Sequence, residues 1–157
     1  MRLLFSRFKI KPLLDVFLPF NSIGAIVKIC KTISRGIKII PGDGSAREYA
    51  ASCQKVLGGL ANICIEYATK RYRSNCVNWG ILPFTNPDKE IVLEPGEYVY
   101  LPGIRKAVEE GATKVTATVI GTDGSTRPME LELKNVTEAE KKVLLAGSLI
   151  NFYKEEK

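Results

Sequence analysis

The stretch IKIIPGDGSAREYAASCQKVLGGLANICI, residues 37–65, predicts a strand, a helix and a second strand. The apolar run Ile37–Ile40 is typical of a short buried strand and stops at a proline. Ser45 and Glu48 stand in the S-x-x-E relation of a capping box, so a helix should begin there and end at a glycine pair. Leu60–Ile65 is again short and apolar, as a buried parallel strand is. The three elements form one βαβ unit, whose crossover should be right-handed.

The loop Gly42-Asp43-Gly44-Ser45-Ala46-Arg47-Glu48 joins the first strand of this unit to its helix. Free backbone amides and the helix dipole favour an anion at this position, and glycines let the backbone approach a ligand closely. Arg47 occupies the third glycine position of a dinucleotide fingerprint, and the G-K-[ST] sequence of a P-loop is absent. The loop therefore predicts a carboxylate site, in which Arg47 can bind bidentately.

Two simpler interpretations of this loop stay open from the spacing alone. Ser45 could be only a helix N-cap, which would explain a serine followed by Glu48 three positions later. Arg47 could equally be a surface arginine with no ligand.

Downstream of residue 65 the sequence predicts shorter elements. Thr69–Asn78 is typical of a short helix, and Ile81–Phe84 should lead into a loop. Ile91–Leu93 and Tyr98–Tyr100 are expected to be short strands on either side of a Pro-Gly turn. A helical turn should follow at residues 102–108.

Near the C-terminus, alternating apolar residues predict an antiparallel hairpin and a last helix. Lys114–Ile120 and Met129–Leu133 each have the pattern of a half-buried strand, and Asp123-Gly124 between them is a strong turn signal. Thr137 and Glu140 form a second capping box. The apolar face of the helix that follows consists of Val143, Leu144, Leu145, Leu149 and Ile150.

These elements predict an α/β fold, with a small, largely parallel sheet, flanking helices and an added antiparallel hairpin at residues 114–134.

The composition, 45% hydrophobic and 25% charged over 157 residues, is that of a folded globular protein. The apolar runs fall short of the roughly 18 residues that span a bilayer, so we expect no membrane partner. The chain has no histidine, which excludes the usual Ser-His and Cys-His nucleophile pairs.

The net charge of +6 is not spread evenly along the chain. Residues 1–40 carry eight basic side chains and one aspartate, whereas the remaining 117 residues carry 15 basic and 16 acidic side chains. The body is therefore close to neutral, and we expect it not to bind nucleic acid.

The four cysteines include no C-x-x-C pair; they are Cys30, Cys53, Cys64 and Cys76. We therefore interpret them as reduced thiols of a cytoplasmic protein.

Three motifs, in this order, resemble the C-terminal swivelling domain of the aconitase superfamily. They are Gly44-Ser45-Ala46-Arg47-Glu48-Tyr49-Ala50-Ala51, then Asn75 with Asn78–Phe84, and finally Ala146–Asn151. The resemblance implies that Ser45 is the base that moves the substrate's proton and that Arg47 binds a substrate carboxylate. It also places Gly44 and Ala46 beside the substrate, through their backbone.

The resemblance implies a swivelling β/β/α domain at residues 37–157, after an atypical basic segment at residues 1–36. The implied function is that of a swivelling domain or small subunit of a hydro-lyase that dehydrates and rehydrates a hydroxy tricarboxylate. The chain itself would bind no cofactor. A 4Fe-4S cluster is expected on a partner domain or large subunit, and without it the chain would be inactive. Two alternatives are the small subunit of an isopropylmalate dehydratase-like enzyme and a non-catalytic interaction or RNA-contacting remnant.

Overall fold

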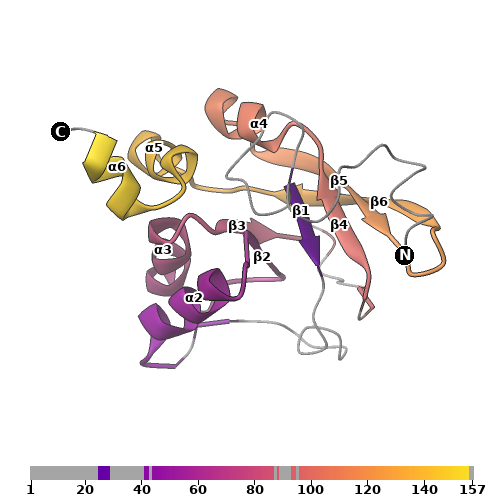
Figure 1. Cartoon of the computed structure of the whole chain (residues 1–157), viewed down its shortest axis with the longest axis horizontal. Coiled ribbons are helices and arrows are strands. Elements are labelled where there is room, and N and C mark those ends of the chain that lie inside the picture. Colours follow the sequence, from indigo (N-terminus) through magenta and orange to yellow (C-terminus); the bar gives the residue numbers. More distant parts are fainter. Residues whose placement is uncertain are drawn as a thin grey trace.

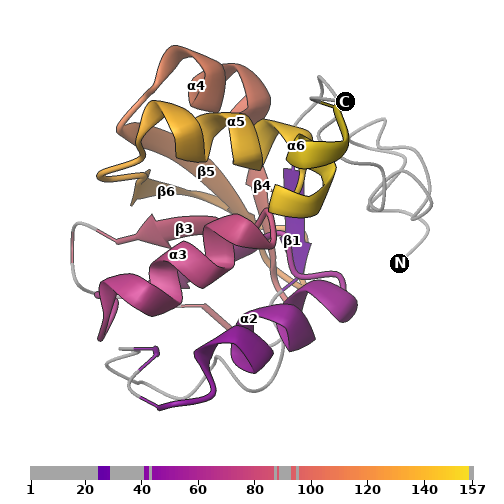
Figure 2. The same cartoon turned by 90° about the vertical axis from the view of Figure 1, so that its left-hand side faces the viewer.

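The computed structural model describes residues 25–28, 41–42, 44–86, 88, 93–94 and 96–155. In this part of the chain, strands form one sheet in the order β1-β4-β5-β6-β3-β2. The strands are β1 Ala25–Lys28, β2 Ala61–Cys64, β3 Leu82–Thr85, β4 Tyr98–Leu101, β5 Lys114–Ile120 and β6 Thr126–Glu132. The helices are α2 Arg47–Val56, α3 Lys70–Asn78, α4 Ile104–Glu110, α5 Glu138–Ala146 and α6 Leu149–Glu155. Figures 1 and 2 show α2, α3, α5 and α6 on one side of the sheet.

The α/β class and the antiparallel hairpin are confirmed, but the sheet is mixed rather than largely parallel. Among the described strands, β2 and β3 pair in parallel, and the other four pairings are antiparallel. Antiparallel pairings are in the majority because the β5–β6 hairpin has the longest ladder, with seven residue pairs. Strand β4 pairs antiparallel with β5, and β1 pairs antiparallel with β4. A tight turn closes the hairpin, with Gly121 N–H donating to Ser125 O at 2.8 Å.

The segment Ile81–Phe84, predicted to lead into a loop, contains most of strand β3, which includes Pro83. The neighbouring amides explain how a proline fits there. Leu82 N–H donates to Leu60 O at 3.0 Å and Asn86 N–H to Cys64 O at 2.9 Å, so alternate amides face β2. The nitrogen of Pro83 faces the other side, toward β6, where β3 pairs only through Thr85. The missing donor therefore removes no ladder hydrogen bond.

The predicted last helix is two helices. Gly147 adopts φ 82 and ends α5, and α6 begins two residues later. Asn151 Nδ2 then donates to Ala146 O at 3.1 Å, which satisfies a carbonyl at the end of α5. A Cβ added to Gly80 would overlap the carbonyl oxygen of Gly147, so the end of α3 and the end of α5 meet backbone to backbone.

Several local signals are confirmed. The Thr137–Glu140 capping box is present in both directions. The glycine pair after α2 ends the helix, since Gly58 has φ 83 and donates to Lys55 O while Gly59 donates to Gln54 O. The expected strand Ile37–Ile40 lies outside the described residues, as do Ile91 and Val92. No described helix is long and apolar enough to cross a membrane.

Two clusters of buried side chains make up the core of the described chain. The larger lies between the sheet and helices α4 and α5, and includes Phe84, Leu101, Ile104, Leu131 and Leu144. The smaller one packs α2 against α3 and consists of Ala51, Tyr72, Cys76 and Ile81. The α2–α3 pair therefore has a small core of its own, and that pair carries the candidate site.

Candidate functional site

The loop before α2 is attached to the start of α3 through two carbonyls, of which Pro41 O accepts from Ala68 N–H at 3.0 Å. Gly42 O accepts a hydrogen bond from Arg47 Nε at 2.9 Å and another from Thr69 Oγ1 at 3.1 Å. Thr69 is also the N-cap of α3 and accepts from Tyr72 N–H. Gly42 has φ 92, and a Cβ there would overlap the side chain of Tyr72, so only glycine fits. These hydrogen bonds hold the beginnings of α2 and α3 side by side.

The predicted capping box of Ser45 and Glu48 is wrong. Ala46 is the N-cap of α2, and no side chain caps this helix. Glu48 instead accepts hydrogen bonds from Asn75 Nδ2 and Trp79 Nε1, both at 2.6 Å. Two side-chain donors, Asn75 on α3 and Trp79 at its C-cap, occupy the carboxylate that a capping box would need for the N-cap amide.

Ser45 is consequently exposed, and among the described residues its hydroxyl has no hydrogen-bond partner. The simpler interpretation of Ser45 as a helix cap is therefore excluded by the geometry. The hydroxyl is available to a ligand.

Ser45 and Arg47 come together in an open depression of about 400 Å³ between α2 and α3. We call it the Ser45 depression; it is lined by Ser45, Arg47, Glu48, Lys70, Arg71, Ser74 and Asn75. Gly44 and Ala46, the other two predicted site residues, are exposed beside Ser45 in the chain. A Cβ on Gly44 would meet nothing within 4 Å, so the backbone is accessible there.

Lys70, Arg71 and Ser74 were missed by the sequence analysis. Lys70 and Arg71 are the first two residues of α3, and the Ser74 hydroxyl donates to Lys70 O at 3.1 Å. A basic pair at the start of a helix was visible in the sequence. What was not visible is that this helix begins next to the loop of Ser45.

The Ser45 depression is electropositive. Three of its lining side chains are basic and one, Glu48, is acidic. The partly buried Arg47 uses Nε for the backbone bond to Gly42, and its terminal amino groups have no partner among the described residues. Unpaired amides in the first turns of α2 and α3 add partial positive charge. The arrangement suits a carboxylate, with a serine hydroxyl in the same depression.

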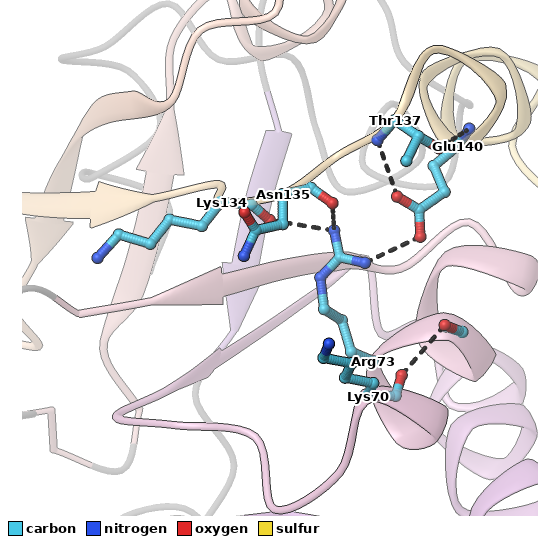
Figure 3. A network of polar contacts seen from close by, with 7 residues as sticks. Lys70, Arg73, Lys134, Asn135, Thr137 and Glu140 are labelled. Carbon is cyan, nitrogen blue, oxygen red and sulfur yellow. Dashed lines mark hydrogen bonds and ion pairs between the residues drawn. The ribbon is translucent and has the colours of Figure 1, made fainter.

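Arg73, on α3, fixes this helix to the rest of the domain (Figure 3). Its guanidinium bonds Glu140 Oε1 at 2.8 Å and donates to the carbonyls of Lys134 and Asn135 at 3.1 and 2.9 Å. The same Glu140 accepts from Thr137 N–H in the capping box of α5. One side of the Ser45 depression is thereby tied to the start of α5.

The described cysteines do not fit an iron–sulfur cluster. Among the described residues, no three His, Cys, Asp or Glu side chains lie together in a way that could hold a metal ion. Burial raises the pKa of the Cys64 thiol to about 12, and burial also raises the pKa of Cys76. Cys53, by contrast, is exposed.

Comparison with known proteins gives two matches, both to proteins named aconitate hydratase A. The one from Rickettsia felis is 30% identical over 115 residues, which is 71% of this chain and 13% of that protein. The one from Bradyrhizobium diazoefficiens is 33% identical over 94 residues, 57% of this chain and 10% of that protein. The chain thus spans only about a tenth of these relatives. No protein-family profile matches. The two matches support the aconitase family.

Proposed function

We propose that this chain is the swivelling domain or small subunit of an aconitase-like hydro-lyase, and that it supplies a serine base and a carboxylate-binding arginine. The observation that carries the proposal is that Ser45 and Arg47 line one electropositive depression. The Ser45 hydroxyl is not used as a helix cap. The similarity to two aconitate hydratases supports the reaction class.

The reaction removes a proton from a carbon next to a carboxylate and hydroxide from the adjacent carbon, leaving a double bond. Hydration reverses both steps. In the proposal Ser45 Oγ, as the alkoxide, takes the proton and returns it. An alkoxide needs positive charge nearby, and Arg47 together with the first-turn amides of α2 provides it. Arg47 also grips the carboxylate and so holds the substrate carbon close to Ser45.

The described residues account for only part of such a site. The depression is open, and the described residues contain no group of three side chains that could hold a metal ion. We therefore propose that a partner domain or large subunit covers the depression, carries the 4Fe-4S cluster and completes the pocket for a hydroxy tricarboxylate. The isolated chain should be inactive. We propose that the complex works in the cytoplasm.

A chimera tests this proposal. In the Rickettsia felis aconitate hydratase A, the segment that matches this chain would be replaced by residues 25–157, which keep β1 of the sheet, and the cluster reconstituted under anaerobic conditions. We expect the chimera to hydrate cis-aconitate and the isolated chain not to. A chimera that is folded and loaded with its cluster yet inactive would count against the proposal, as would turnover by the isolated chain.

A further inference from the structure

We propose that Lys70 and Arg71 bind a second carboxylate of the substrate and make the Ser45 depression selective for tricarboxylates over dicarboxylates. This inference rests on the proposed function, since it concerns the same site. It adds two binding residues, at the start of α3, to the serine and arginine of the loop before α2.

The first argument is that these two cations lack internal partners. Six described basic side chains pair with carboxylates: Arg73, Arg105, Lys106, Arg127, Lys134 and Lys141. The exposed side chains of Lys70 and Arg71 make no hydrogen bond or ion pair within the described chain. Both line the depression instead. Their charges are therefore available to an anion that enters it.

The second argument is that hydrogen bonds hold the start of α3, which carries Lys70 and Arg71, next to Arg47. Thr69, the residue before Lys70, donates to Gly42 O, and Arg47 donates to the same oxygen. On the other side of the depression, Glu48 bonds Asn75 and Trp79, so α2 and α3 are tied at two levels. Anchors on two fixed elements can hold two carboxylates of one ligand at once, which lowers the entropy lost on binding.

The third argument is the polarity of the lining. Every residue that lines the depression is polar or charged, and its net charge is positive even with Glu48 included. A branched alkyl substituent, as on isopropylmalate, would find no apolar contact there and would leave Lys70 and Arg71 unpaired. A third carboxylate would pair with them. The lining thus favours the tricarboxylate over the dicarboxylate substrate.

Ligand titration of the full chain, followed by NMR or calorimetry at low ionic strength, tests the inference. The probes are citrate, malate and inorganic phosphate, compared in the parent chain, Arg71→Gln and Lys70→Gln. The control is Lys106→Gln, an exposed lysine on α4 that pairs with Glu110. We expect the parent chain to prefer citrate over malate and phosphate. Each substitution should reduce citrate affinity about fivefold, the size of one partly exposed charge pair, and reduce malate affinity less.

Unchanged citrate affinity in both variants would overturn the inference. So would equal losses for citrate, malate and phosphate, because they would indicate a general charge effect. Absence of citrate binding to the parent chain would overturn it as well. This result is separable from the proposed function. If the chimera is active but its preference for citrate does not change on substitution of Arg71, only this inference is contradicted. If the chain binds citrate selectively but the chimera is inactive, only the enzymatic role is contradicted.

Discussion

Glu48 and Trp79, which lie 31 positions apart in the chain, are joined by a 2.6 Å hydrogen bond from the indole Nε1 to the carboxylate. The other carboxylate oxygen accepts from Asn75 at the same distance. These contacts connect the first of the three aconitase-like motifs to the second. The second meets the third where Gly80 lies against the carbonyl of Gly147. The three motifs, separated in sequence, are therefore one continuous structural unit around α3.

Substitution of Glu48 should loosen this unit. Glu48→Gln has one oxygen for two donors, so one of the two hydrogen bonds is lost and a donor is left without its acceptor. We expect a loss of about 1–2 kcal/mol in the free energy of unfolding, measured with urea. Trp79 is the only tryptophan, so its emission should also shift. Glu66→Gln, at an exposed glutamate, is the control and should change neither quantity. A stable Glu48→Gln with unchanged emission would contradict the contact.

Ser45 and Thr137 form a matched pair for testing helix capping. Thr137→Ala removes a hydroxyl that accepts from Glu140 N–H and should cost about 1 kcal/mol. Ser45→Ala removes a hydroxyl that caps nothing, so the free energy of unfolding should change by less than about 0.5 kcal/mol. Equal losses in urea unfolding would restore Ser45 to the role of a cap.

Gly80 and Gly103 test the contact between α3 and the end of α5. Both have positive φ, 64 and 61, so alanine carries a similar backbone cost of roughly 1 kcal/mol at each. A Cβ at Gly103 would meet nothing within 4 Å, whereas at Gly80 it would overlap the carbonyl of Gly147. We expect Gly80→Ala to destabilise the protein by about 3 kcal/mol or more, because backbone must move. Similar thermal unfolding of the two variants would argue against this contact.

The cysteines should differ sharply in reactivity. In a Cys30→Ser background, Cys53 is exposed and should react with a thiol reagent at pH 8 within minutes. Cys64 and Cys76 are buried with raised pKa values, so their thiolate fractions are low and they should react only when the protein unfolds. Titration with a chromogenic disulfide, before and after adding denaturant, measures this. Rapid reaction of three thiols in the folded chain would contradict the buried positions.

The signals that sequence analysis interpreted correctly are those whose partners lie a few residues away. The Thr137–Glu140 box and the Gly58 helix end depend on atoms within one turn, and the β5–β6 hairpin depends on a short turn. Glu48 had the same capping spacing as Glu140, but donors 27 and 31 positions away compete for it. The strand that contains Pro83 was likewise not predicted, because the side of β3 that its nitrogen faces depends on the neighbouring strands.

The candidate site was predicted only in part, because some of its residues are neighbours in the sequence and others are distant. The loop sequence around Ser45 and Arg47 indicated an anion site by itself, since glycines, a helix start and an arginine are local features. Lys70 and Arg71 join it through contacts between distant residues, the hydrogen bonds of Thr69 and Arg47 to Gly42 O and those of Glu48 to Asn75 and Trp79, which no spacing in the sequence reveals.

The central claim, that Ser45 is the base of a hydro-lyase half-site, is tested most directly by comparing two serines of the same depression. Ser74 lines it too, but its hydroxyl donates to Lys70 O, so it is the matched control. In the active chimera, kcat for cis-aconitate hydration should fall by about a hundredfold or more in Ser45→Ala and stay within about twofold in Ser74→Ala. Equal turnover by the two variants would contradict the assignment of Ser45 as the base.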